Sequence, residues 1–252
     1  MSPQAPITDL HCHLLPGLDD GAADGKTAWR MAQAAVASGV GRVVCTPHCT
    51  TEDADLARRA EMVRHAAAAM NRALLARGVP LSVFTGMELL CGRGLAETLS
   101  RRQVLTLAGS RYLLLEFRFA ERLSFMEWAA SCARQAGYWP VLAHPERYTA
   151  VQREPLCLAE WFRAGMVLQL DKSSVLGDFG RRCAQTSHWA LDRGLAHVVA
   201  SDAHDTETRT ASFRRVEDLI TQRYSAAYAQ LLLRRNPGRV VADRPMVQAD
   251  DA

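Results

Sequence analysis

Long hydrophobic runs are missing from this sequence. Its purely apolar stretches, such as 66–70 and 112–115, fall far short of the about 20 residues that a membrane-spanning helix needs. The first ten residues, MSPQAPITDL, contain neither the basic nor the apolar region of a secretory signal. We therefore expect a cytoplasmic protein without stable insertion into a membrane.

Regularly spaced cysteines and a strong excess of one charge are also missing. The seven cysteines are irregularly spaced in a chain without an export signal, which favours reduced thiols over a disulfide framework. The 30 basic and 27 acidic residues leave a net charge of +3, which argues against a nucleic-acid partner. The 48% hydrophobic and 23% charged residues indicate a globular protein rather than a disordered or fibrous one.

Short apolar runs alternate with stretches of helical periodicity along the chain. The runs, which predict seven strands, are 7–10, 42–46, 81–85, 112–117, 139–143, 166–170 and 197–201. The helical stretches are 26–38, 54–77, 124–136 and 180–193, and glycines at 39, 78, 137, 165 and 194 stand where helices should end. This alternation predicts an α/β fold with a parallel sheet.

The placement of polar residues favours a closed barrel over an open sheet. A barrel gathers side chains from many strands at its C-terminal rim, whereas an open sheet focuses them at one switch point. Nearly every predicted strand ends in His, Asp or Glu, so we predict a seven-stranded (β/α) barrel. Because no linker divides the chain, we expect residues 1–252 to form a single domain, with a loose tail after about residue 240.

The predicted strand ends carry enough donors for several metal ions. In an extended chain, His11 and His13 face the same side, so that both can bind one ion. The nine candidate ligands are His11, His13, Asp20, His48, Glu88, Glu116, His144, Asp202 and His204. Such nitrogen and oxygen donors suit divalent ions of the manganese, iron or zinc type. Neighbouring ions can lower the pKa of a shared water and stabilise the oxygens of phosphoryl transfer.

Two arginines complete this hypothesis. Arg147 and Arg209 each follow a presumed ligand, and the planar guanidinium fork fits phosphate oxygens. The residues therefore point to hydrolysis of a phosphate ester, although they identify no general acid.

The same residues resemble a known family. The segments HCHLLPG (11–17), DDG (19–21), TPH (46–48), GMEL (86–89), LEF (115–117), AHPERY (143–148) and SDAH (201–204) resemble the polymerase and histidinol phosphatase (PHP) superfamily. Within it, they are most similar to the bacterial capsule and exopolysaccharide tyrosine-protein phosphatases of the CpsB and YwqE type. The resemblance extends from residue 7 to about residue 240.

This resemblance implies a distorted seven-stranded barrel with a trinuclear centre that hydrolyses phosphotyrosine through a metal-bridging hydroxide. The metal would be manganese, three ions per chain, with iron, zinc, cobalt or magnesium as alternatives. By the resemblance, His11, His13, Glu88 and Asp202 would hold the first ion; Glu88, Glu116 and His144 the second; Asp20, His48 and His204 the third. Arg147 and Arg209 match the family's phosphate-binding arginines.

The resemblance also implies a partner and a substrate-side loop. The partner would be a tyrosine autokinase that controls polysaccharide export, and the loop would comprise 169–174 and 177–180. Two positions depart from the family pattern. Asp171 stands where the family often has Asn, and Cys49 stands where a second His often follows His48. Neither position is one of the nine candidate ligands, so these departures concern substrate preference.

Three other interpretations stay open beside the tyrosine phosphatase. The substrate could instead be a small phosphomonoester such as histidinol phosphate, or a nucleic-acid end. A protein without activity that keeps its metals for stability is the third alternative.

Several residues imitate functional motifs. Cys157 and Arg163 have the spacing of a cysteine-based phosphatase, but the sequence between them has no glycine and predicts a helix. A structural zinc site around Cys45, His48 and Cys49 would need further thiolates that the sequence does not pair with them. We interpret His65, His188 and His197 as surface or core residues, and Glu146 as a candidate to support His144.

Overall fold

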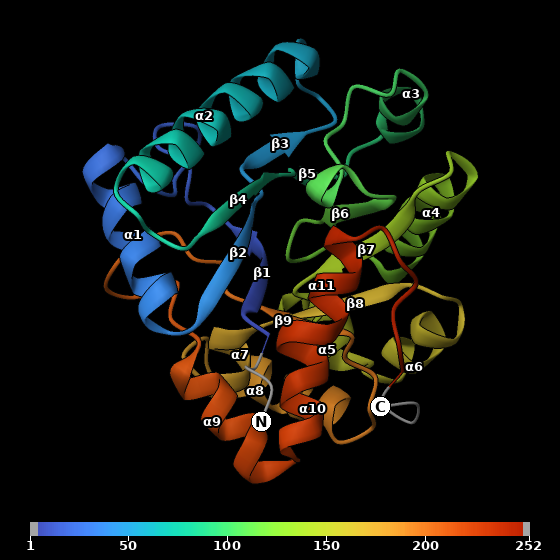
Figure 1. Ribbon diagram of the computed structural model, residues 1–252. Helices are drawn as coiled ribbons and strands as arrows, with labels where there is room; N and C mark the ends of the chain where they lie inside the picture. Colours follow the sequence, from blue (N-terminus) through green and yellow to red (C-terminus); the bar gives the residue numbers. More distant parts are fainter. Residues whose placement is uncertain (1–4, 249–252) are drawn as a thin grey trace.

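All paired strands in the described part of the chain, residues 5–248, run parallel to their neighbours (Figure 1). In this computed structural model they form two sheets. One has the order β1 (Ile7–Cys12), β2 (Val40–Cys45), β4 (Ser82–Thr85). The other has the order β3 (His48–Thr50), β5 (Glu88–Leu90), β6 (Tyr112–Glu116), β7 (Trp139–Ala143), β8 (Val167–Asp171), β9 (Val198–Ala200). The predicted α/β fold with parallel strands is confirmed.

Two of the seven predicted strands are each followed, after a break, by a short strand that was not predicted, and the two breaks divide the sheet. Thr46 and Pro47 separate β2 from β3, while Gly86 and Met87 separate β4 from β5. Pro47 has no N–H for a strand ladder, and a Cβ on Gly86 would approach the Val44 side chain to 3.0 Å. β2 therefore pairs with β4, and β3 pairs with β5 in the other sheet. A single closed seven-stranded barrel, as predicted, is not detected in the strand pairing.

The two sheets also approach each other at the far side, next to β1. Cys12 forms an isolated parallel bridge with Ala203, just after β9. The His13 N–H donates to the Ala203 carbonyl at 2.9 Å, and the Asp202 N–H donates to the His11 carbonyl at 2.9 Å. The C-terminal ends of the first and last strands therefore lie side by side.

The four predicted helices are confirmed. They are α1 (Gly25–Ala37), α2 (Leu56–Ala76), α4 (Leu123–Gln135) and α8 (Arg181–Leu191). Asp24 and Asp55 cap α1 and α2 by accepting hydrogen bonds from backbone N–H groups of the first turn. The glycines expected at helix ends all have positive φ, between 65° and 90°. Helices α1 and α2 pack beside β2 and β4 (Figure 1).

The remaining helices are shorter; the one between Cys157 and Arg163 was predicted, whereas most of the others were not. These shorter helices are α3 (Leu95–Ser100), α5 (Thr149–Arg153), α6 (Leu156–Arg163), α7 (Lys172–Leu176), α9 (Arg214–Arg223), α10 (Ala226–Gln230) and α11 (Asn236–Val241), with the 3₁₀ turns η1 (Leu107–Gly109) and η2 (Pro145–Arg147) and the π-helical turn η3 (Leu231–Arg235). Six residues or fewer leave too little periodicity for recognition in most of them. Helices of the C-terminal segment return to β1 and β9 (Figure 1).

The strands are buried, as expected for parallel strands that are covered on both faces. Every residue of β1 and β8 is buried. These strands carry polar residues as well as apolar ones, because Asp9, His11, Gln169 and Asp171 are all buried. These buried polar residues require hydrogen-bond or charge partners. Such partners lie at the strand ends described below.

The C-terminal segment corrects one prediction. Up to residue 248 the chain after Pro237 is held against the protein rather than loose. Val240 is fully buried on α11, the Tyr112 hydroxyl donates to the Arg244 carbonyl at 2.9 Å, and Asn236 exchanges hydrogen bonds with the backbone of Val247. The contact between Tyr112 and Arg244 joins positions 132 residues apart, which no local sequence pattern could predict. The last part of the expected tail, 249–252, lies outside the described residues.

Across residues 5–248, no helix is both long enough and apolar enough to cross a membrane. All seven cysteines are free.

Candidate metal centre

The end of β1 presents two imidazoles to the same side, as the sequence predicts. His11 is the fifth residue of the strand and His13 follows it, and both are buried. Their Nε2 atoms lie 3.2 Å apart. Leu10 and Cys12 alternate with them and are buried in the apolar core.

His11 and His13 meet two buried carboxylates from distant parts of the chain. His11 Nε2 lies 3.1 Å from Glu88 Oε2 and 3.3 Å from Asp202 Oδ1, and His13 Nε2 lies 3.4 Å from each of these oxygens. One ligand atom of each of the four residues lies within 4.8 Å of the others. This group is the set of residues expected for the first ion.

A second group surrounds Glu88 on its other side. His48 Nδ1 lies 2.9 Å from Glu88 Oε2 and 3.4 Å from Glu116 Oε2, and the three residues form a compact group. His144 Nε2 lies 2.9 Å from Glu88 Oε1 and 4.0 Å from Glu116 Oε1. The residues expected for the second ion are therefore adjacent, but His48 also approaches their carboxylates.

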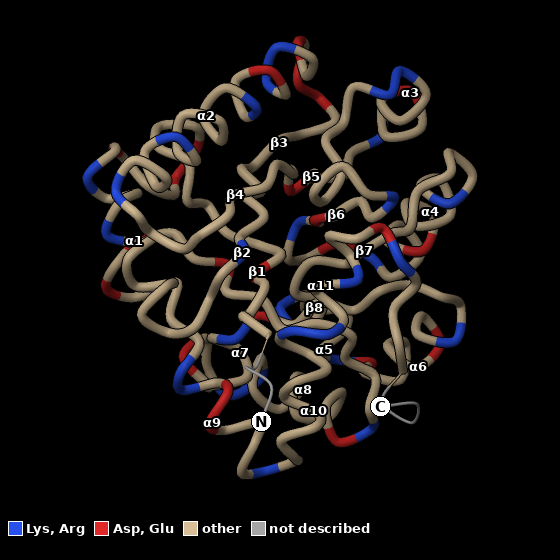
Figure 2. Tube along the Cα trace, viewed as in Figure 1, with Lys and Arg blue, Asp and Glu red and all other residues tan. Residues whose placement is uncertain are grey.

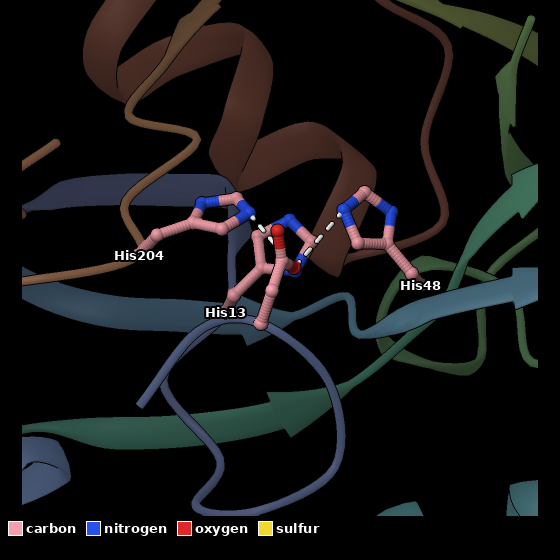
Figure 3. Close-up of side chains that lie close together, drawn as sticks. His13, His48 and His204 are labelled. Atoms are coloured by element: carbon pink, nitrogen blue, oxygen red, sulfur yellow. Dashed lines mark ion pairs between the residues drawn. The ribbon is translucent and has the colours of Figure 1, made fainter. Parts of the chain in front are cut away.

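The third group lies at the more exposed side of the cluster and contains His13, Asp20, His48 and His204. Figure 3 shows the His13, His48 and His204 side chains close together. Asp20 Oδ1 lies 3.4 Å from His48 Nε2 and 3.5 Å from His204 Nε2. The Asp20 side chain is 68% exposed, which places this group at the entrance to the cluster. It includes the residues expected for the third ion, together with His13.

The electrostatics of the cluster fit a cation site. Burial by itself would raise the pKa values of Glu88 and Asp202, but the neighbouring imidazoles hold both well below the ordinary range. Burial would lower the pKa of His48, but Glu116 and Glu88 raise it to about 10. Among the described residues, Glu88 Oε2, Asp202 Oδ1 and His204 Nε2 are buried and form no regular hydrogen bond, although each lies close to another candidate ligand. Buried oxygen and nitrogen atoms of this kind fit hard or borderline divalent cations.

Three residues support the cluster in a way that sequence reasoning did not assign to them. Asp19 Oδ2 accepts hydrogen bonds from His13 Nδ1 at 2.7 Å and from the His48 N–H at 3.0 Å. Burial would raise the pKa of Asp19, but His13 outweighs this effect and lowers it to about 2. Gln169 Oε1 lies 3.1 Å from His11 Nδ1, and Asp9 accepts from the Ser201 hydroxyl and N–H. Such contacts fix the orientation of the imidazoles, and only the position of Asp19 beside Asp20 hinted at one of them.

Backbone strain is present at two of the candidate ligands. His144 and Asp202 have φ values of 35° and 48°, in the left-handed region that side chains other than glycine rarely adopt. His144 directly follows β7 and Asp202 follows β9 by two residues. At both positions the backbone turns and the side chain joins the cluster. Residues in such conformations occur often at functional sites.

Arg147 and Arg209 meet at one edge of the cluster, as predicted. Arg147 Nη1 donates to Asp202 Oδ2 at 2.9 Å, and Arg209 Nη2 donates to the same oxygen. Arg147 also lies 3.8 Å from Asp171 Oδ2, one of the residues that depart from the family pattern. Two guanidinium groups are thus fixed beside the candidate metal ligands.

A cavity of about 580 Å³ opens beside His48 and Glu116. The first turns of α2 and the residues before it form much of its wall, including Arg58 and Met62. Solvent and small molecules therefore have room next to the cluster.

Apart from His48, the residues that imitate functional motifs belong to none of the candidate metal groups among the described residues. Cys157 and Arg163 are both on α6, so the segment between them cannot wrap an anion. Among residues 5–248, the three candidate metal groups contain no cysteine, and His65, His188 and His197 belong to none of them. His188 Nδ1 lies 2.9 Å from the Tyr224 hydroxyl. Glu146 is buried and accepts a hydrogen bond from the Asp171 N–H at 3.0 Å.

The fold and the site together define an α/β protein in which imidazoles and carboxylates from several parallel strands form a metal-type cluster beside two arginines. The chain belongs to the family described as "Capsular polysaccharide synthesis, CpsB/CapC", whose model matches residues 7–242. The family predicted from the sequence motifs is thereby confirmed.

Individual relatives agree with this assignment. The chain is 35% identical over 203 residues to the tyrosine-protein phosphatase YwqE of Bacillus subtilis (strain 168), covering 81% of this chain and 79% of the relative. It is 26% identical over 248 residues to the tyrosine-protein phosphatase CpsB of Streptococcus pneumoniae, covering 94% and 99%.

Solved structures show the same relationship. The chain matches a crystal structure from a study of Bacillus subtilis YwqE and Streptococcus pneumoniae CpsB, described as "unique metal-dependent tyrosine phosphatases". The match has a TM-score of 0.87 and 29% identity over 97% of this chain and 98% of the other. A β-aspartyl dipeptidase from Fervidobacterium islandicum AW-1 matches with a TM-score of 0.62 and 14% identity over 94% and 72%, which shows a shared fold alone.

Proposed function

We propose that the protein is a metal-dependent protein-tyrosine phosphatase, which hydrolyses phosphotyrosine in a protein substrate. The observation that carries the proposal is the meeting of nine nitrogen- or oxygen-donor residues with Arg147 and Arg209 in one cluster. The names of the relatives support the same activity. A non-catalytic scaffold is disfavoured because both the donors and the arginines are present.

The proposed ligands are those predicted from the sequence. His11, His13, Glu88 and Asp202 would hold one ion, Glu88, Glu116 and His144 a second, and Asp20, His48 and His204 a third. We propose manganese, with iron, zinc, cobalt or magnesium as alternatives, because the donors are nitrogen and oxygen. When bound, such ions lower the pKa of a coordinated water and stabilise charge on phosphoryl oxygens.

The two arginines would bind the phosphate group of the substrate. Arg147 and Arg209 share Asp202 Oδ2, so this carboxylate holds both guanidinium groups at one edge of the cluster. The other N–H groups of each fork would donate hydrogen bonds to phosphate oxygens, which would fix the phosphorus atom beside the metal ligands.

We further propose how the chain is organised and where it acts. The two sheets would work as one distorted barrel in a single domain, supported by the bridge between Cys12 and Ala203 that joins their ends. The protein would act in the cytoplasm on a tyrosine autokinase of capsule or exopolysaccharide synthesis, supported by the description of the family.

Two substitutions test the activity. We expect His48→Ala and Asp202→Ala to leave the chain folded by circular dichroism, and to reduce hydrolysis of a phosphotyrosyl peptide by about 100-fold or more, because each removes a metal ligand. Metal analysis of protein purified without chelator should find two to three equivalents in the wild type, as the proposed sets of ligands require. Full activity in both variants would refute the proposed site.

Substrate comparison separates the tyrosine phosphatase from its alternatives. Turnover of phosphotyrosyl peptide, histidinol phosphate and single-stranded DNA should be fastest with the peptide. Lysine, arginine and acidic residues are interspersed along the chain (Figure 2), which provides little attraction for a nucleic acid. Preference for histidinol phosphate or DNA would overturn the proposed substrate but not the metal centre.

A further inference from the structure

An exposed aromatic side chain stands beside the cluster without a role so far. Phe119 follows β6 by three residues and is 49% exposed. Its ring centroid lies 6.5 Å from that of His144 and 6.4 Å from that of Tyr148. The Phe119 carbonyl accepts a hydrogen bond from the Thr149 N–H at 2.9 Å, so this part of the loop is tied to the segment that carries Arg147.

Arg147 lies close to two aromatic rings. Its guanidinium carbon is 4.9 Å from the centroid of Phe119 and 4.5 Å from the centroid of Phe179. Phe179 also lies 5.8 Å from the guanidinium carbon of Arg209. Both rings therefore border the place where the two arginines would bind phosphate.

The two rings differ in exposure and in their surroundings. Phe179 is only partly exposed and stands in a tight turn between Gly177 and Gly180, which both have positive φ. Within this turn, the Asp178 N–H donates to the Ser173 carbonyl at 2.8 Å and the Gly180 N–H donates to the Gly177 carbonyl at 3.0 Å. Phe179 is thus fixed next to both arginines, whereas Phe119 keeps about half of its surface free.

We propose that Phe119 determines specificity for aryl phosphates by packing against the aromatic ring of the substrate. The inference rests on the proposed function, since it places the phosphate on Arg147 and Arg209. A phenyl ring joined to that phosphate projects out of the cluster, and Phe119 supplies an apolar surface immediately beside the arginine. An aliphatic phosphate ester has no ring to fill this position.

The known strength of aromatic packing gives the expected change in affinity. Pairs of aromatic rings contribute enough beyond area burial to change an affinity by about two- to tenfold. Phe179 would act differently, as a positioning residue that supports Arg147 and therefore affects all phosphate ligands alike.

Binding of two phosphonates tests the inference without turnover. Isothermal titration of manganese-loaded protein with phenylphosphonate and methylphosphonate gives the ratio of the two affinities. We expect the wild type to prefer phenylphosphonate, and Phe119→Ala to reduce this ratio by about three- to tenfold. The affinity for methylphosphonate should change less than about twofold, because it is set by the arginines and metals.

Three further variants provide the controls. Phe119→Leu keeps an apolar side chain without the ring and should lose most of the preference. Trp128→Ala removes another partly exposed aromatic residue, which packs against Phe125 on α4, and should leave the ratio unchanged. Phe179→Ala should weaken both ligands equally.

The outcomes separate this inference from the proposed activity. No preference for phenylphosphonate in the wild type, or an equal loss of both ligands in Phe119→Ala, would overturn the role of Phe119. A clear phenyl preference without hydrolysis of a phosphotyrosyl peptide would contradict the proposed activity and leave the aryl-binding surface in place.

Discussion

Among single residues, the surroundings of each histidine decide its charge. His48 is close to Glu116 and Glu88, which raise its pKa to about 10 although burial would lower it. His197 is more deeply buried, no carboxylate of residues 5–248 lies beside it, and burial lowers its pKa to about 4. Its Nδ1 accepts a hydrogen bond from the Leu168 N–H at 3.1 Å, and its ring stacks on Phe162. Histidine is therefore a candidate metal ligand at position 48 and a packed core residue at position 197.

His197 predicts a dependence of stability on pH. The unfolded chain binds a proton at His197 below about pH 6.5, whereas the folded chain does so only below a pH of about 4. The unfolded state therefore holds more protons between these values, and the stability contributed by neutral His197 is lost as the pH falls through this window. From pH 8 to pH 5 the loss amounts to about 2 kcal/mol.

Urea unfolding of the wild type and His197→Asn checks this prediction. The stability of the wild type relative to the variant should decrease by that amount between pH 8 and pH 5, because the asparagine does not titrate. Other titrating groups cancel in the comparison. An equal difference at both pH values would contradict a neutral, buried His197.

At the scale of secondary-structure elements, the loop between β1 and α1 controls the entrance of the cluster. It carries Asp19 and Asp20, and it folds back so that the Ala22 N–H donates to the His13 carbonyl at 3.0 Å. Gly21 makes this approach possible, because a Cβ there would lie 2.3 Å from the His13 carbonyl oxygen and 2.4 Å from the His13 Cβ. The loop and the strand end are therefore one structural unit.

Gly21→Ala should displace this loop. We expect a loss of stability of about 1–3 kcal/mol from overpacking, and a loss of phosphatase activity of about 10-fold or more because Asp19 and Asp20 move away from His13 and His48. Thermal unfolding measures the loss of stability, peptide turnover measures the loss of activity, and metal content shows whether the two carboxylates have moved.

Gly25→Ala is the matched control for this substitution. A Cβ on Gly25, the first residue of α1, meets no atom within 4 Å. Activity should be unchanged, and stability should stay the same or increase by up to about 1 kcal/mol. Normal metal content in Gly21→Ala would show that the loop adapts without moving its carboxylates.

At the scale of the whole molecule, the candidate metal centre joins the two sheets. His11 lies on β1 of the smaller sheet, while Glu88 and Glu116 belong to strands of the larger one. His48 begins β3 of the larger sheet and Asp202 follows β9, and each of these residues approaches another within 3.4 Å. Cations bound here would connect elements that the strand pairing leaves in separate sheets.

Metal removal should therefore destabilise the whole protein. A ligand present at 100 times its Kd stabilises the folded state by about 2.7 kcal/mol for each site that it fills. We expect the Tm to fall when EDTA removes bound ions and to recover on addition of manganese. Asp202→Ala, which lacks one proposed ligand, should show a smaller difference between the two conditions. Identical Tm values with EDTA and with manganese would argue against a centre of this kind.

Comparison of sequence and structure shows where prediction succeeded. The pairing of His11 and His13 followed from the two-residue period of a strand, and the glycines at helix ends followed from their freedom to adopt positive φ. The division of β2 from β3 was also visible in the sequence as Pro47, but its consequence for the sheets was not. A broken strand can change partners at the break, and only the positions of neighbouring strands show that it does.

The sequence by itself determined the alternation of strands and helices and the kinds of donor at the strand ends, because periodicity, capping residues and ligand chemistry are local properties. Tertiary structure alone decided that Asp19 orients His13 and that Phe119 and Phe179 both lie against Arg147. These contacts depend on how separate elements pack and turn at their ends. The distance between two residues far apart in the sequence depends on all the backbone angles between them. No local pattern in the chain determines these angles together.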